Sequence, residues 1–178
     1  MTTRTYKNDN IEVHWDSSRC VHVAACIRAL PDVFNPLDRP WIHLDRADAD
    51  TVAAAIEHCP TGALRYTRPD GSTELASNPT TIVLVEDGPL VVRGDLHLTD
   101  ANGETIIRES RLALCRCGGS ENRPYCDGTH RRIGFRSTTI PIDSITRDNA
   151  TNPTDIEPPQ TASFDPNAAP LPLPNAED

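Results

Sequence analysis

The sequence predicts an α+β fold made of two small modules, a short connection between them and a C-terminal tail. The first region, Thr3–Arg68, combines an alternating apolar pattern with alanine-rich stretches, which favours strands together with helices. The second region, Thr81–Ile142, alternates apolar and polar residues between turn sequences, which favours a sheet. The last region, Ser144–Asp178, has seven prolines after Thr151 and few large apolar residues, so we expect a disordered, acidic, proline-rich tail.

The first module is expected to contain two strands and two helices. The string "YKNDNIEVHW" alternates enough to predict a strand, with one apolar face made by Ile11, Val13 and Trp15. Cys20–Leu30 is apolar and rich in alanine, which predicts a short helix ended by the proline that follows. The string "DADTVAAAIEHC" places acidic residues before alanines, a helical pattern, and Ala63–Tyr66 is predicted to be a return strand.

The second module is expected to be rich in β structure. Its strands lie within "TIVLVEDGPLVVRGDLHLTDANGETIIRES", where "EDGP" and "DANGE" supply turns. The string "GFRSTTIPI" at residues 134–142 is predicted to be a closing strand. The connection Thr67–Thr80 is rich in Pro, Gly, Ser and Asn, which indicates turns between the modules. One apolar face of the sheet is expected at Leu90, Val92, Leu96 and Leu98.

Charge and cysteine content narrow the class of protein. The 178-residue chain has a net charge of −9, which disfavours nucleic-acid binding, where a basic surface is expected. It has no apolar run of about 18 residues, which a membrane span needs, and no apolar leader, so we expect a soluble, cytoplasmic protein without a membrane partner. A reducing cytosol disfavours disulfides between the six cysteines, and metal or cluster binding is the better interpretation.

The string "CRCGGSENRPYCDGTH" concentrates soft metal ligands in one loop. Cys115 and Cys117, with one residue between them, point to the same side of extended backbone, which suits two thiolates on one iron. Cys126 and His130 are four residues apart, so a helical turn capped by Asp127 would bring both to a second iron. Three glycines would let backbone N–H groups approach the sulfurs. These glycines are Gly118, Gly119 and Gly128.

This loop resembles the CDGSH iron–sulfur family, also called NEET proteins, over the whole signature and more broadly over about residues 85–135. The resemblance implies a CDGSH domain over 81–142 and a [2Fe–2S] cluster, with Cys115 and Cys117 on one iron and Cys126 and His130 on the other. A neutral imidazole in place of a thiolate removes negative charge, which raises the reduction potential. A structural zinc site with the same ligands is the alternative, although Cys-x-Cys is tighter than usual zinc spacing.

The other three cysteines, Cys20, Cys26 and Cys59, form a second group, "CVHVAAC" followed later by "CPTGAL". This stretch resembles the divergent single-cluster 4Fe–4S ferredoxin domain, which implies a ferredoxin-like module over 3–68. Val23 stands where a ferredoxin run has its middle cysteine, so three thiolates fit [3Fe–4S] or, with another fourth ligand, [4Fe–4S]. His22 could be that fourth ligand or an ordinary histidine beside the cluster, and both alternatives stay open. The remaining alternative is that these cysteines are merely small buried residues.

Two iron–sulfur sites on one short chain predict a soluble electron carrier that exchanges electrons with a redox partner protein, a reductase or an oxidase. The alternative is a protein that transfers its cluster to an apo acceptor or senses redox state or pH. The sequence has no nucleotide-binding glycine loop, nucleophile elbow or HExxH motif, so we expect no enzyme activity of its own. NEET proteins are often homodimers, which makes a homodimer one assembly to consider, although the sequence indicates no interface.

Overall fold

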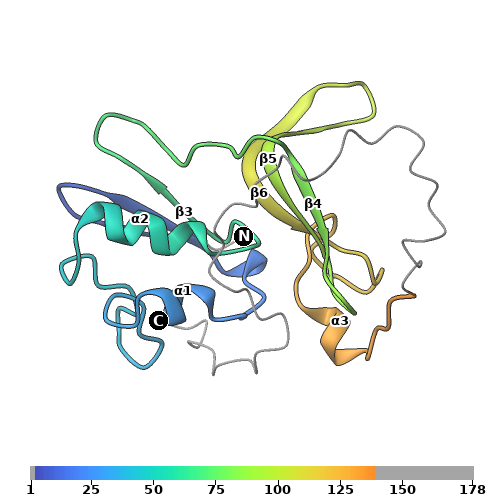
Figure 1. The fold of residues 1–178 in the computed structure, drawn as a ribbon, viewed down its shortest axis with the longest axis horizontal. Coiled ribbons are helices and arrows are strands. Elements are labelled where there is room, and N and C mark those ends of the chain that lie inside the picture. Colours follow the sequence, from blue (N-terminus) through green and yellow to red (C-terminus); the bar gives the residue numbers. More distant parts are fainter. Residues whose placement is uncertain (1–2, 139–178) are drawn as a thin grey trace, which may run out of the picture.

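The computed structural model describes residues 3–138 and has an α+β fold with two small antiparallel sheets (Figure 1). The predictions for residues 139–142 and for the tail lie outside the described residues. None of the helices in the described range has the length and hydropathy that a membrane crossing requires. In chain order the elements are β1 (Thr3–Lys7), β2 (Glu12–Asp16), η1 (Ser17–Arg19), α1 (Ala25–Ala29), α2 (Ala49–Glu57), β3 (Leu64–Thr67), β4 (Thr81–Leu84), β5 (Leu90–Thr99), β6 (Thr105–Leu114) and α3 (Thr129–Arg132).

The first sheet has the order β1-β2-β3 and carries the larger apolar core. Its central strand β2 directs Val13 and Trp15 into this core, as the alternation predicted, and Ile11 just before it is buried with them. The single strand expected over "YKNDNIEVHW" is instead a hairpin, because Tyr6 and Lys7 belong to β1 and residues 8–11 turn back before β2. Helix α2 covers the core with Val52, Ala53, Ala55 and Ile56, and the Asp48 side chain caps its first turn by accepting hydrogen bonds from Asp50 and Thr51. The helix and return strand predicted for this region are therefore confirmed.

The helix predicted over Cys20–Leu30 is only partly present. Helix α1 is confined to Ala25–Ala29, and the residues before it form an irregular loop. His22 and Ala24 have φ angles of +55° and +56°, a left-handed conformation that is uncommon outside glycine and that no helix continues. The alanine-rich composition suggested a longer helix because propensity ignores the tertiary contacts that hold this loop.

The second sheet, β4-β5-β6, is dominated by the long β5–β6 hairpin, whose pairing shifts register between Arg93 and Leu96. Val92, Leu96 and Leu98 pack with Leu112, as expected for the apolar face of β5, whereas Leu90 is half-buried and is not part of this cluster. The closing strand predicted for residues 134–142 is absent from its described part, residues 134–138, because the chain turns after α3 and continues irregularly.

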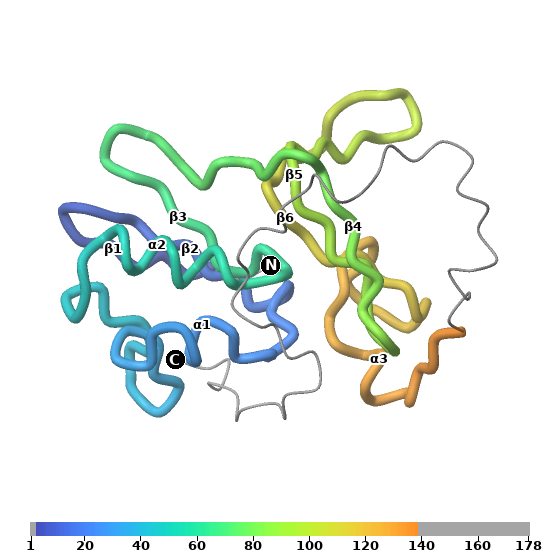
Figure 2. The backbone as a smooth tube through the Cα atoms, viewed as in Figure 1, coloured from blue at the N-terminus to red at the C-terminus, as the bar shows by residue number. Residues whose placement is uncertain are grey.

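The two halves of the described chain lie side by side, joined through one face of β6 (Figure 2). Alternate side chains of a strand point to the same side, so Glu109, Arg111 and Ala113 share the face that meets the first module. Ala113 packs in a common apolar cluster with Val21 and Val23 from the loop before α1. The modules therefore share part of their core.

A buried ion network reinforces this contact. Arg19 Nη1 lies 2.6 Å from Glu109 Oε1, and the two side chains are only 4% and 3% exposed. Arg65 Nη1 lies 3.0 Å from the same carboxylate oxygen, and the Arg19 guanidinium also stacks 4.6 Å from the centre of the Tyr125 ring. Because the buried Arg19 and Glu109 charges compensate each other, the two modules cannot separate without exposing these charges or leaving one of them unpaired.

We predict that Glu109→Ala lowers the free energy of unfolding by about 3 kcal/mol or more, because it leaves the Arg19 guanidinium buried and unpaired. Urea unfolding followed by far-ultraviolet circular dichroism measures the change. The control is Glu12→Ala, which removes the more exposed ion pair with Lys7 and should cost less than about 1 kcal/mol. Equal losses in the two variants would contradict the buried network.

Candidate metal centres

The loop after β6 brings the first two of its cysteines together. Cys115 follows the strand directly, and its backbone N–H donates to the Pro124 carbonyl at 2.9 Å. The sulfurs of Cys115 and Cys117 lie 3.8 Å apart, and the Gly119 N–H donates to Cys117 Sγ at 3.4 Å. This arrangement forms one pair of thiols supported by a backbone donor.

Cys126 and His130 form a second pair. Cys126 Sγ lies 3.4 Å from His130 Nδ1, and both residues are buried. The expectation that one helical turn would carry both was wrong in detail, since α3 starts at Thr129 and Cys126 lies in the loop before it. Gly128 makes the connection possible, because its φ of +85° suits glycine and its N–H donates to Cys126 Sγ at 3.4 Å.

The spacing within each pair fits two ligands of one tetrahedral metal. Metal–sulfur bonds of about 2.3 Å put two sulfur ligands about 3.8 Å apart, and replacing one sulfur by an imidazole nitrogen shortens this to about 3.6 Å. Within residues 3–138, no group of three or more His, Cys, Asp or Glu side chains converges where one metal ion could bind. Two separate pairs suit a cluster with two irons better than a single zinc ion, which needs four donors around one point.

Asp127 holds the loop that carries these pairs. Its two carboxylate oxygens accept backbone hydrogen bonds from Glu121 at 3.0 Å and from Thr129 at 2.9 Å. Burial alone would raise the pKa of Asp127, but these N–H donors lower it below its usual range. Ser120 adds a further tie, since its hydroxyl donates to the Tyr125 carbonyl at 2.7 Å. The loop is therefore shaped by hydrogen bonds independent of any metal.

The ionisation of these side chains differs across the site. Burial raises the pKa of the Cys126 thiol to about 11, despite the Gly128 N–H that opposes it. Burial also acts on Cys115, but backbone N–H groups led by that of Ser120 outweigh it and lower the pKa of this thiol. Burial and the positive charge of Arg131 lower the pKa of His130. The imidazole is thus neutral near pH 7, the form that binds metal, while Cys126 exchanges its proton for a metal.

The other three cysteines line a cavity in the first module. Cys20, Cys26 and Cys59 meet there from the loop before α1, from α1 itself and from the segment after α2. The indole ring of Trp15 lines the same cavity and packs edge-on against Trp41, with ring centres 5.0 Å apart. Three cysteines distant in the sequence therefore converge on one apolar space.

This cavity suits a group that accepts hydrogen bonds and carries negative charge. The Trp15 indole N–H is buried without a hydrogen-bond partner within the described residues, and it lies close enough to Cys20 to favour that thiolate. Burial and then the neighbouring Cys59 raise the pKa of Cys20 to about 11, and burial raises that of Cys26 as well. Cys59 is also buried, which alone would raise its pKa, but the Arg111 charge and then hydrogen bonds from Leu64 and Thr61 lower the pKa of this thiol. The residues present thus fit a thiolate-bound iron–sulfur cluster.

His22 lies at the edge of this site, against one of its cysteines. Its Nδ1 is 3.5 Å from Cys20 Sγ, which is hydrogen-bonding distance. Ligands on different corners of a cuboidal cluster lie farther apart than ligands on one iron, so this position favours a hydrogen-bonding neighbour over a fourth ligand. Burial, followed by the charge of Arg131, lowers the pKa of His22.

The residues that connect the two sites give no signal in the sequence. The Arg131 Nη1 donates to the Val21 carbonyl at 2.9 Å, so a residue next to His130 contacts the loop next to Cys20. Arg111 donates from β6 to the carbonyl of Cys59. Basic residues at these positions give no distinctive pattern in the sequence, and only the packing of the modules shows their partners.

The two donor sets define the chain as an iron–sulfur protein, and comparisons with known proteins support this class. Residues 6–69 match the family described as divergent 4Fe-4S mono-cluster, and residues 87–131 match the iron-binding zinc finger of CDGSH type. The chain belongs to both families, with the mono-cluster domain first and the CDGSH-type domain after it.

Two relatives are similar over part of the chain. They are the uncharacterized protein YjdI of Escherichia coli strain K12 and its counterpart in Escherichia coli O157:H7. Each is 38% identical over 63 residues, which cover 35% of this chain and 83% of the relative.

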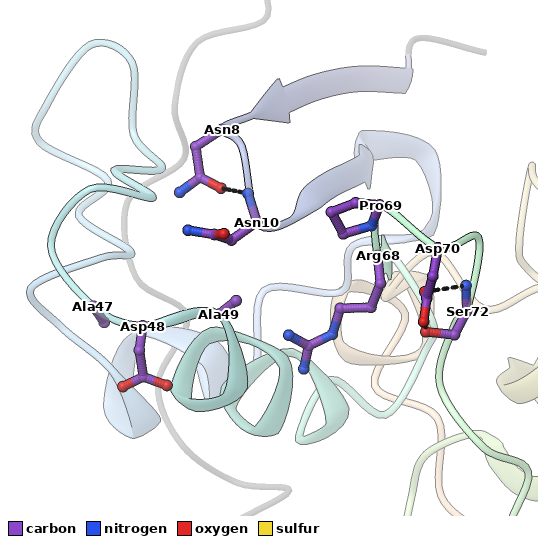
Figure 3. A pocket seen from close by; sticks show the side chains of 9 residues that line it. All are labelled: Asn8, Asn10, Ala47, Asp48, Ala49, Arg68, Pro69, Asp70 and Ser72. Atoms are coloured by element: carbon purple, nitrogen blue, oxygen red, sulfur yellow. Dashed lines mark hydrogen bonds between the residues drawn. The ribbon is translucent and has the colours of Figure 1, made fainter.

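A larger hollow in the described part of the chain lies away from all six cysteines. It has a volume of about 630 Å³ and opens beside the start of α2 (Figure 3). Its polar side chains bond mainly to their own neighbours, as when Asp70 accepts from Ser72 and Asn8 accepts from Asn10. Its lining offers no thiol or imidazole, so it adds nothing to the metal sites. The lining residues are Asn8, Asn10, Ala47, Asp48, Ala49, Arg68, Pro69, Asp70 and Ser72.

We predict that Asp127→Ala speeds the loss of visible absorbance from the CDGSH-type domain by about fivefold at pH 7.5, equivalent to about 1 kcal/mol. The variant removes both backbone hydrogen bonds that shape the ligand loop. The matched control is Asp100→Ala, which removes a similar pair of backbone hydrogen bonds in the β5–β6 turn. If both variants lost colour at the wild-type rate, Asp127 would not hold the loop.

Proposed function

We propose that the chain is an electron carrier with two iron–sulfur clusters. In this proposal Cys115, Cys117, Cys126 and His130 bind a [2Fe–2S] cluster, and a second cluster is bound in the first module. The CDGSH-type match implies the first cluster type, and the mono-cluster match implies a [4Fe–4S] type for the second. The clusters would supply one-electron redox centres. We propose as ligands of the second cluster Cys20, Cys26 and Cys59.

The second cluster has fewer cysteines than a standard cuboidal site. Three thiolates bind three corners, and the place of His22 against Cys20 argues against its nitrogen as the ligand of the fourth. The cluster then has either three irons or a fourth iron with a ligand from outside the chain. The Trp15 N–H and the backbone of the left-handed loop at His22 are available as donors to its sulfurs.

One observation mainly supports the proposal: the two candidate sites lie next to each other and share packing contacts. The apolar cluster that contains Val21 and Val23 also contains Cys126. Arg131 reaches the backbone at Val21, and its charge acts on both His22 and His130. This proximity favours single-electron exchange within one chain, because residues next to both sites pack in one apolar cluster.

The charge of the chain suits a particular kind of partner. With a net charge of −9, the protein would be attracted to a basic surface on a reductase or oxidase. Such attraction speeds encounter more than it strengthens the complex, and it weakens as salt is added. We therefore propose a redox protein with a basic docking patch as the partner.

Transfer of the [2Fe–2S] cluster to an apo acceptor, or its release as a pH or redox signal, is the second candidate. One observation favours it: Cys115 and Cys117 are half-buried, whereas Cys126 and His130 are buried. An acceptor protein could approach the cluster from the side of Cys115 and Cys117 while Cys126 and His130 still bind it.

One experiment separates these candidates. Holo protein is mixed either with a ferredoxin reductase and its reduced nicotinamide cofactor or with an apo-ferredoxin, and both reactions are followed by visible spectroscopy. We predict that reduction by the reductase is much faster than appearance of holo-ferredoxin. Rapid cluster transfer with negligible reduction would reject the electron carrier in favour of the second candidate.

We predict that the absorbance of the [2Fe–2S] cluster decays faster as the pH falls below about 6.5, the ordinary pKa of histidine. Only neutral imidazole binds iron, and the lowered pKa of His130 keeps it neutral to lower pH, so decay accelerates below that value rather than above it. His130→Cys should remove this acceleration, and His97→Gln, a change on the same module, should leave it unchanged. Wild-type acid sensitivity in His130→Cys would show that another group is responsible.

A further inference from the structure

Arg111 lies in the CDGSH-type domain but makes its contacts in the other one. It is 1% exposed, and its Nη1 donates to the Cys59 carbonyl while its Nη2 donates to the Leu64 carbonyl at 2.9 Å. One guanidinium thus holds both ends of the segment "CPTGAL", which carries the last cysteine of the N-terminal site.

The "CPTGAL" segment also packs closely against the backbone of β6. Gly62 has a φ of +64°, and a Cβ at this position would lie 2.6 Å from the Arg111 carbonyl oxygen. Arg19 Nη2 donates to the Thr61 carbonyl at 3.0 Å. Neither the left-handed backbone nor the close approach would tolerate a larger residue at Gly62, so the contact with Arg111 shapes this turn.

The charge of Arg111 is balanced by a residue of the connection between the domains. Arg111 Nε lies 2.9 Å and 2.8 Å from the two carboxylate oxygens of Glu74, and Nη2 lies 2.7 Å from one of them. The Glu74 side chain is 12% exposed. In such a buried place, water screens neither charge well, and each acts strongly on its surroundings.

We infer that Arg111 is a positioning residue for the N-terminal cluster, supplied by the CDGSH-type domain, and that the Arg111–Glu74 pair sets the reduction potential of that cluster. The inference rests on the proposed binding of a cluster by Cys20, Cys26 and Cys59. A cluster gains negative charge on reduction, so a nearby positive charge stabilises the reduced form and a nearby negative charge destabilises it. The guanidinium donates to the Cys59 carbonyl, whereas the Glu74 carboxylate is paired with the guanidinium.

This inference predicts opposite shifts for two substitutions. Arg111→Gln removes the positive charge and should move the potential of the N-terminal cluster to a more negative value. Glu74→Gln removes the compensating negative charge, keeps the guanidinium in place and should move the same potential to a more positive value. Because Cys115 and its partners belong to a separate site, the potential of the [2Fe–2S] cluster should move less in both variants. A purely structural role for the pair predicts no such change of sign.

The experiment is a redox titration of the whole chain followed by electron paramagnetic resonance, which separates the signals of the two clusters. Controls with the same charge changes are Arg46→Gln, whose side chain is 42% exposed, and Glu104→Gln in the exposed β5–β6 turn. Both should leave the N-terminal potential unchanged. If Arg111→Gln fails to fold, Glu74→Gln still decides the question.

An upward shift in Glu74→Gln, with the controls unchanged, supports the inference. An unchanged or lowered N-terminal potential in Glu74→Gln overturns it, even when Arg111→Gln has lost stability. A wild-type chain that contains no N-terminal cluster signal, in either redox state, instead rejects the proposed cluster binding. The two failures are therefore distinguished by the wild-type spectrum.

Discussion

The alternation of side chains along β6 is the constraint on which both sites depend. Because residues two apart in a strand share a face, Glu109, Arg111 and Ala113 all meet the first module, and the strand then delivers Cys115 to the ligand loop. A shift of one residue in the pairing of β6 would turn the buried charges to the opposite face. The strand therefore organises the domain contact and the start of the CDGSH-type site together.

This arrangement makes the two domains depend on each other for their structure, unlike two independent domains joined by a linker. The N-terminal turn at Gly62 has its shape because β6 occupies the adjacent space, and the loop at Val21 is held by Arg131 beside His130. The charged side chains buried between the domains have their partners in both domains. Local unfolding of one domain would therefore leave charges of the other buried and unpaired, which costs free energy. Such coupling holds the two candidate metal sites at a constant separation.

The sequence predicted the helices and strands, and which cysteines lie near one another, better than it predicted the contact between the two modules. The alternation at Val13 and the alanine-rich pattern of α2 are local signals, and both elements formed as expected. The helix predicted over Cys20–Leu30 was too long, because tertiary contacts hold His22 and Ala24 in a left-handed backbone conformation. The ion pair between Glu74 and Arg111 could not be predicted, since the two residues are distant in the sequence. The connection that contains Glu74 shows only a turn-rich composition.

The central claim is that both cysteine groups bind inorganic iron and sulfide, and metal analysis of the isolated chain tests it most directly. Protein purified without oxygen is assayed for iron, zinc and acid-labile sulfide, and its paramagnetic resonance spectrum is recorded oxidised and reduced. We predict a brown protein with about five or six irons and about six sulfides per chain. Colourless protein without iron, or with one zinc ion per chain and no sulfide, would contradict it.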